Sequence, residues 1–273
     1  MIPTLSQVCS LNSPFAMDVE DYAAGHCHSL EVWLTKLETY LREHTVEDVR
    51  RLLAEHEMSV PVASFQGGLL ASQGEARREA WGLFHRRLQL CRDVGIGTLV
   101  VACDVPHPVL QTDVQRVLAS LDQAAGAAGE AGVRLALEFQ AGSALGNNLR
   151  TCVSLVGQVG SAHLGICLDV FHFYVGPSKT SDFAELNGGN LFHVQLSDIV
   201  ERPREFAVDA DRVMPGEGDI GVSELVRRLR EIEYGGTVSL ELMNPQIWQV
   251  PPRQFGEIGM TALRKILGQA EHG

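Results

Sequence analysis

The hydrophobic pattern alternates between two kinds of segment along the whole chain. Short continuous apolar runs, such as TLVVAC at 98–103, are typical of strands buried on both faces of a parallel sheet. Longer segments, such as 74–93, carry apolar residues at helical spacing. The predicted strands are 3–15 with its loop, 29–34, 59–65, 98–103, 134–139, 163–171, 191–196 and 237–242. The predicted helices are 46–58, 74–93, 113–132, 148–159, 181–186, 222–231 and 254–267, and a polar loop covers 197–219.

This order predicts an α/β protein, because strands that alternate with helices form parallel sheets with crossover connections. Eight such units in a chain of 273 residues favour a closed (β/α)8 TIM barrel over an open doubly wound sheet. No linker or change in composition divides the chain, so we expect a single domain over 1–273. No glycine-rich nucleotide-binding motif follows an early strand.

Composition and charge argue against some classes of partner for such a barrel. The formal net charge is −12, which argues against nucleic acid and against an anionic membrane surface as partners. No apolar run is long enough to span a bilayer, and the first residues lack the pattern of a signal peptide. The six cysteines are scattered without a paired motif, which favours reduced, buried thiols in a cytoplasmic protein.

Polar residues stand at the ends of four late predicted strands, each within an apolar stretch. They are Glu138, Asp169, the pair His193 and Gln195, and Glu241. A carboxylate is costly to bury unless it is paired or binds a metal, and the carboxyl ends of barrel strands share one mouth, where active sites lie. The pattern therefore predicts an oxygen-rich site for one divalent ion, Mn²⁺, Mg²⁺ or Co²⁺, with Zn²⁺ as an alternative.

Four segments carry a resemblance to a known family: LALEFQAG at 135–142, LDVFHF at 168–173, DADRVMPGEGDI at 209–220 and VSLELMNPQIW at 238–248. The chain resembles the xylose isomerase-like TIM barrels, the superfamily of sugar phosphate isomerases/epimerases and AP endonuclease 2. Among them it is most similar to bacterial 2-keto-myo-inositol (inosose) isomerases. The resemblance implies a metal-dependent isomerase or epimerase that acts on a small keto-sugar or keto-cyclitol, and it is compatible with a homo-oligomer.

The resemblance also implies a ligand set for the metal. Glu138, Asp169 and Glu241 match the three metal carboxylates of the family. The fourth ligand of the family is a histidine, but the position that matches it here holds Gln195, whose carbonyl oxygen can bind a hard metal. The alternatives are His193, two residues earlier on the same side of the strand, which would reach the metal or the substrate from deeper in the barrel, and water.

Further residues are candidates for contact with the substrate. His172 matches a histidine with which the family binds substrate, and Arg212 lies inside the matching DRV segment. Trp33 could stack on a sugar face at the end of a strand, and Gln66 follows the next strand. Asp198, just after the strand of Gln195, is a candidate to orient that amide or a bound water.

Glu138 and Glu241 match the pair that, in the epimerases, binds metal and also exchanges the proton next to the substrate carbonyl through an enediolate. A lyase on the same scaffold is the main alternative, because loss of a neighbouring substituent can follow the same proton abstraction. An inosose dehydratase or a 3-keto-glycoside lyase would react in this way. A binding protein without activity remains open if Gln195 abolishes metal binding, whereas the charge disfavours an AP endonuclease.

Overall fold

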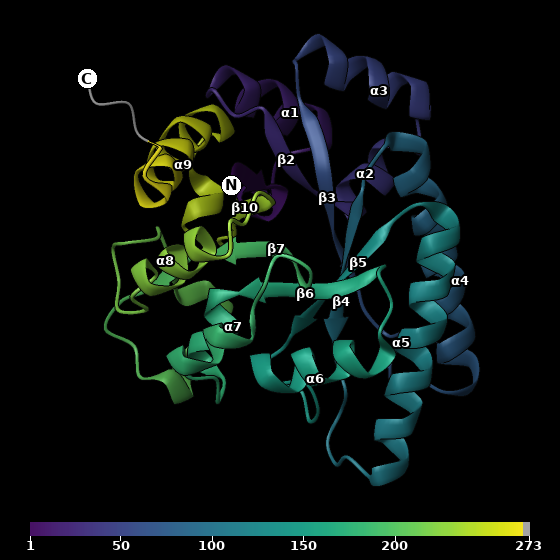
Figure 1. The fold of residues 1–273 in the computed structure, drawn as a ribbon. Helices are drawn as coiled ribbons and strands as arrows, with labels where there is room; N and C mark the ends of the chain where they lie inside the picture. Colours follow the sequence, from purple (N-terminus) through teal and green to yellow (C-terminus); the bar gives the residue numbers. More distant parts are fainter. Residues whose placement is uncertain (270–273) are drawn as a thin grey trace.

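Eight parallel strands close into a barrel in the computed structural model, which describes residues 1–269 (Figure 1). The barrel confirms the predicted fold class. Its strands, each paired with the next and the last with the first, lie in the spatial order β1, β10, β7, β6, β5, β4, β3, β2. Their bounds are β1 Ile2–Ser6, β2 Ser29–Trp33, β3 Ser59–Gln66, β4 Thr98–Cys103, β5 Arg134–Phe139, β6 Leu164–Asp169, β7 Leu191–Leu196 and β10 Thr237–Leu240.

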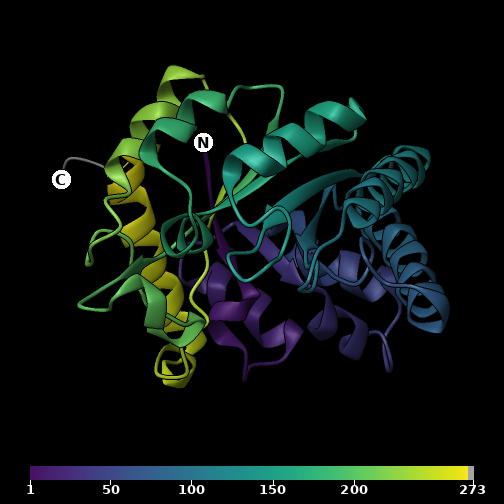
Figure 2. The same ribbon diagram turned by 90° about the horizontal axis from the view of Figure 1, so that it is seen from below.

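Helices follow the strands and surround the barrel (Figures 1 and 2). They are α1 Phe15–Ala24, α2 Leu34–Tyr40, α3 Val46–Glu55, α4 Gly74–Val94, α5 Gln111–Ala131, α6 Leu149–Val159, α7 Val170–Val175, α8 Ser223–Glu231 and α9 Pro252–Leu267. The long helices end where the sequence indicates, because Gly95, Gly132 and Gly160 take the left-handed conformation that glycine adopts without strain.

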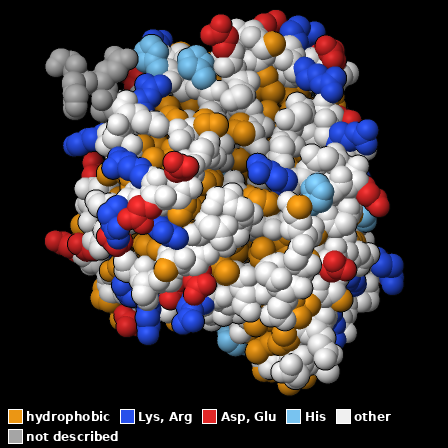
Figure 3. Space-filling view, in the orientation of Figure 1, with side chains coloured by type: hydrophobic (Ala, Val, Ile, Leu, Met, Phe, Trp, Pro, Cys, Tyr) orange, Lys and Arg blue, Asp and Glu red, His pale blue; other side chains and the backbone are white. Residues whose placement is uncertain are grey.

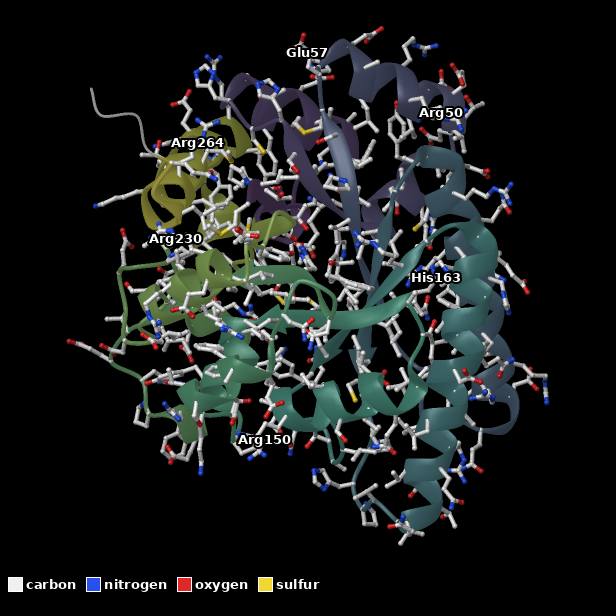
Figure 4. The ribbon with its side chains drawn as sticks, in the orientation of Figure 1. Arg50, Glu57, Arg150, His163, Arg230 and Arg264 are labelled. Atoms are coloured by element: carbon white, nitrogen blue, oxygen red, sulfur yellow. The ribbon has the colours of Figure 1, made fainter. Side chains whose placement is uncertain are left out.

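The first and last elements meet where the barrel closes. Leu5 of β1 is in register with Leu240 of β10 on one side and with Leu30 of β2 on the other. Outside this seam α9 lies beside α1 (Figure 2). Arg264 donates a hydrogen bond of 3.0 Å to the carbonyl of His26, and Arg230 of α8 donates to the end of α9 (Figure 4).

Three predicted strands, 98–103, 134–139 and 191–196, match the structure residue for residue. Helices α1 and α2 were not predicted. The predicted strand 163–171 is too long, since β6 ends at Asp169 and α7 begins at Val170. The reason is local: Asp169 Oδ1 accepts a hydrogen bond of 2.6 Å from the amide of Phe171 and so caps the new helix. The predicted helix 181–186 is a 3₁₀ turn, Thr180–Glu185.

The loop predicted at 197–219 is folded back on itself. Its first residues, β8 (Asp198–Ile199), pair in antiparallel fashion with β9 (Arg212–Val213). A Cβ atom on Gly218 would lie 2.2 Å from the carbonyl oxygen of Ile199, so glycine is needed for this close approach. This pairing sets Arg212 in register with Ile199, which follows β7 closely in the chain.

A small apolar cluster fills the inside of the barrel below the strand ends. It consists of Val62, Val100, Ala136, Cys167 and Phe192. Because side chains alternate along a strand, the residues two positions after Ala136 and Cys167 also point inward. These are the residues predicted for the site on β5 and β6. The polar site therefore lies directly above this apolar cluster inside the barrel.

The surface charges, the cysteines and the helices relate to the expectations about nucleic-acid partners, thiols and membrane spans. Basic and acidic side chains are interspersed over the face drawn in Figure 3, with no continuous basic stripe on that face. All six cysteines are free and buried. Within residues 1–269, no helix has the length and apolar character that crossing a membrane requires.

Candidate active site

A cavity of about 500 Å³ opens at the carboxyl ends of the barrel strands. This is the end at which (β/α)8 enzymes carry their active sites. Its walls combine apolar and ionisable side chains: Trp33, Ser64, Phe65, Ala102, Asp104, Val105, Pro106, Glu138, Gln140, Gly142, Ser143, His172, Gln195, Asp209, Arg212, Glu241 and Met243.

Two carboxylates and one imidazole lie close together beside this cavity: Glu138 and His172 line it, and Asp169 is fully buried. Glu138, Asp169 and His172 each offer a ligand atom, and these atoms lie within 4.8 Å of one another. His172 comes from α7, and its Nε2 is 3.9 Å from Glu138 Oε1. Burial raises the pKa of the Glu138 carboxyl well above its usual range, and the charge of Asp169 adds to this effect. Burial also lowers the pKa of His172, which favours a neutral imidazole.

Arg212 is the cation of the site, and its side chain is 1% exposed. Its Nη1 lies 2.8 Å from Asp169 Oδ2 and 3.0 Å from Glu241 Oε2. Its Nε and Nη2 donate to Asp209 Oδ1 at 3.1 and 2.8 Å, and the guanidinium carbon lies 4.3 Å from the ring centre of Phe171. Burial opposes ionisation of Asp169, but the Arg212 charge keeps the pKa of Asp169 below its ordinary value.

Gln195 of β7 lies between two carboxylates. Its Nε2 donates to Glu31 Oε1 at 2.8 Å and to Glu241 Oε1 at 3.0 Å, and its Oε1 accepts from Cys167 Sγ at 3.1 Å. The amide nitrogen, rather than the carbonyl oxygen, therefore faces Glu241. Burial also raises the pKa of Glu241 well above its usual range. That Gln195 and Glu241 complete a four-ligand metal set stays a prediction.

The remaining predicted residues fall into two groups. Trp33 lines the cavity, where its ring centroid is 5.3 Å from that of Phe65. His193, by contrast, is fully buried below the cavity, with Nε2 3.1 Å from Glu31 Oε2 and Nδ1 2.7 Å from the Thr237 hydroxyl. Its surroundings are those of a hydrogen-bonded histidine inside the barrel.

Gln66 and Asp198 form hydrogen bonds that hold the segments around the cavity in place. Gln66 is buried, donates to the carbonyl of Gly67, and accepts from Arg87 at 3.3 Å. Asp198 accepts from the amides of Gly216 and Ile220 at 2.9 Å each. In the described part of the chain, no hydrogen bond joins Asp198 to Gln195.

Sequence reasoning missed the role of Glu31 on β2. Its carboxylate is fully buried, contacts His193 and Gln195, and accepts a hydrogen bond from the Ser64 hydroxyl. Although burial opposes ionisation, the His193 charge and hydrogen bond lower its pKa. The signal was available, because Glu31 stands in an apolar strand between Leu30 and Val32, as Glu138 does in its own strand.

The donor set fits a divalent cation at Glu138, Asp169 and His172. Carboxylate oxygens and an imidazole nitrogen suit Mn²⁺, Co²⁺ and Zn²⁺. His172 Nδ1 is a buried atom without a hydrogen-bond partner, whereas the buried Asp169 Oδ2 has the Arg212 charge 2.8 Å away as its partner. Buried polar atoms are normally satisfied, so the unpartnered imidazole nitrogen marks a place for a ligand.

The fold and the polar mouth define a (β/α)8 barrel of the kind that carries enzymes. Residues 23–266 match the model of the xylose isomerase-like TIM barrel family. The chain belongs to this family, as its sequence motifs suggested.

Individual relatives span most of the chain. The inosose isomerase of Halalkalibacterium halodurans is 27% identical over 244 residues, which cover 88% of this chain and 86% of that protein. The 3-dehydroshikimate dehydratase of Pseudomonas aeruginosa is 26% identical over 93% of this chain and 40% of its own length. A crystal structure of the IolI protein with a zinc atom superposes with a TM-score of 0.92 at 20% identity over the whole of both chains, which shows the shared fold.

Proposed function

We propose that this protein is a divalent-metal-dependent isomerase or epimerase of a keto-sugar or keto-cyclitol. The observation that carries the proposal is the cluster of Glu138, Asp169 and His172 at the barrel mouth, where Glu138, His172 and Glu241 line one cavity. The inosose isomerase among the relatives supports a keto-cyclitol as the first substrate to test. Mn²⁺, Mg²⁺, Co²⁺ and Zn²⁺ all remain candidates, and the zinc of the IolI structure supports including the last.

In this proposal Glu138, Asp169 and His172 hold the metal. When bound, the ion would polarise the substrate carbonyl and stabilise negative charge on its oxygen. The neutral imidazole of His172 would hold the metal through one ring nitrogen and hydrogen-bond a hydroxyl or carbonyl of the substrate through the other.

The proton transfers fall to the two glutamates. Glu138 lies on β5 and Glu241 directly follows β10, so they border the cavity from different strands. Burial raises the pKa of both carboxyls, and for Glu241, which is not among the three proposed ligands, this makes a stronger base that holds a proton nearer neutral pH. One would remove the proton next to the carbonyl, and the other would return it. Trp33 and Phe65 would cover an apolar ring face of the substrate.

Exchange of the substrate proton with solvent tests this function. The purified protein is incubated with Mn²⁺ and inosose in heavy water, and NMR follows deuterium uptake at the carbon next to the carbonyl. We expect uptake with the wild type and a loss of about 100-fold or more in Glu138→Gln and in Glu241→Gln. Glu217→Gln, a change at an exposed position, is the matched control. The proposal fails if no keto-sugar or keto-cyclitol exchanges or if all variants behave alike.

A dehydratase is the second candidate, because a 3-dehydroshikimate dehydratase is also among the relatives. The same proton abstraction would then be followed by loss of a hydroxyl group as water. The product would be a conjugated enone, so its ultraviolet absorbance and the loss of mass would distinguish it from an isomer.

Location in the cytoplasm and assembly into a homo-oligomer stay predictions.

A further inference from the structure

Asp104 and Gln140 stand next to each other on one wall of the cavity. Each is the first residue after its strand, β4 and β5 respectively, and the two strands pair with Ala102 in register with Glu138. Because side chains alternate along a strand, the residues two positions after Ala102 and Glu138 point to the same side. All four residues line the cavity. Asp104 and Gln140 therefore lie one layer above Glu138, toward the opening.

The Asp104 carboxylate is held in place by two glycines. Its Oδ2 accepts a hydrogen bond of 2.6 Å from the amide of Gly68. A Cβ atom on Gly67 would lie 2.9 Å from the same oxygen and 3.6 Å from the ring of Phe65, so glycine leaves the space that the carboxylate occupies. Within residues 1–269, no Lys or Arg pairs with Asp104 and its Oδ1 makes no hydrogen bond. One carboxylate oxygen is thus available to a ligand.

The amide of Gln140 completes this polar edge. The side chain is half-buried and forms no hydrogen bond in the described part of the chain. A carboxylate oxygen accepts hydroxyl protons, and an amide both donates and accepts, so the two groups together suit two adjacent hydroxyls. Trp33 and Phe65, whose ring centroids are 5.3 Å apart, form the apolar part of the wall. Such a combination fits a ring with hydroxyl groups at its edge.

The cavity offers no free cation to an anionic substrate. Among the described residues, Arg212 is the one Lys or Arg in its wall, and its nitrogens lie 2.8–3.1 Å from the carboxylates of Asp169, Asp209 and Glu241. Asp104 adds a further carboxylate with no basic partner. A phosphate group next to Asp104 would meet a like charge, which opposes binding.

We propose that Asp104, with Gln140 beside it, is a specificity-determining residue that binds adjacent hydroxyl groups of an uncharged polyol ring and rejects phosphorylated substrates. This inference rests on the proposed function, since it assigns a substrate class to the same site. Asp104 contacts hydroxyl groups and not the reacting carbon, so its loss should weaken substrate binding more than it slows turnover.

The test compares myo-inositol with myo-inositol 1-phosphate as unreactive probes, in the presence of Mg²⁺, by saturation-transfer NMR. The wild type should bind myo-inositol about tenfold more tightly than the phosphate ester or better. Asp104→Asn keeps an acceptor for Gly68 but loses the charge, so myo-inositol should bind about fivefold more weakly. Asp104→Lys should reverse the order of the two probes. Inorganic phosphate, titrated in parallel with and without Mg²⁺, reports capture by the metal alone.

The deuterium-exchange assay with inosose gives a second measurement. Asp104→Asn should raise KM about fivefold and leave kcat within about twofold of the wild type. Asp122→Asn, the same change at an exposed position of α5, is the matched control and should alter neither constant. Circular dichroism checks the fold of each variant, and Asp104→Asn decides the question by itself if Asp104→Lys does not fold.

The inference is overturned if the wild type binds the phosphate ester as tightly as myo-inositol without help from the metal, if a folded Asp104→Asn binds myo-inositol as the wild type does, or if the wild type binds neither probe. Inosose exchange with an unchanged KM in Asp104→Asn overturns the inference and leaves the proposed function standing. The expected binding pattern without any exchange supports polyol recognition and contradicts the proposed proton transfer instead.

Discussion

Asp198 is predicted to fasten the loop that carries Arg212, and its removal gives a direct test of that role. The carboxylate is 1% exposed and accepts hydrogen bonds from the amides of Gly216 and Ile220 at 2.9 Å each, and from Ile199 at 3.0 Å. A hydrogen bond to a charged group contributes about 1.5–3 kcal/mol. The two long-range bonds alone therefore place the cost of Asp198→Ala at about 3–6 kcal/mol.

The assay is urea unfolding followed by circular dichroism at pH 7. Asp198→Asn keeps one acceptor oxygen and should lose chiefly one of the two bonds, about 1.5–3 kcal/mol. Glu217→Ala, an exposed change in the same loop, should stay within about 0.5 kcal/mol of the wild type. A cost below about 1 kcal/mol for Asp198→Ala would refute the reasoning, since the loop would then be held by other contacts.

Two further predictions concern the barrel itself. A Cβ on Gly165 would lie 2.6–2.7 Å from three ring atoms of Phe192. Gly165→Ala should therefore lower the free energy of unfolding in urea by about 1–3 kcal/mol, and Phe192→Leu should restore part of this loss. An unchanged unfolding midpoint in Gly165→Ala would contradict the clash. Burial raises the pKa of Asp18 to about 6, above about 3.9 in an unfolded chain. The folded state therefore binds this proton more tightly, and the free energy of unfolding should fall by about 3 kcal/mol as pH rises from about 4 to about 6. The same pH dependence in Asp18→Asn/Lys36→Met, which lacks the buried ion pair, would show that another group is responsible.

The fold could be predicted well from the sequence because buried parallel strands carry continuous apolar runs. Such runs defined 98–103, 134–139 and 191–196 to the residue. Helix α2 was missed because it begins directly after β2 and has only 7 residues, too few to show a periodic pattern. The end of β6 was placed too late because the apolar run continues into α7, and only the capping by Asp169 marks the change.

The candidate site could be predicted in part. Glu138, Asp169 and Glu241 were visible as carboxylates at strand ends, and the structure brings them around one buried guanidinium. Glu31 was not predicted as a site residue because the series of strand-end carboxylates in the sequence lies on the late strands, although closure of the barrel makes β2 a neighbour of β1 and β3 around the same mouth. Gln195 was identified, but not which end of its amide would face Glu241.

The sequence by itself determined the barrel, the order of its elements and the acidic character of its mouth. These properties follow from local periodicity and from the cost of burying a charge within an apolar strand. Only the tertiary structure decided which polar groups pair. The contacts of Arg212 with Asp169 and Glu241 span 43 and 29 positions of the chain and depend on the folding back of β9 onto β8. No local sequence pattern indicates such a pairing, because it depends on which charged groups the folded chain buries next to one another.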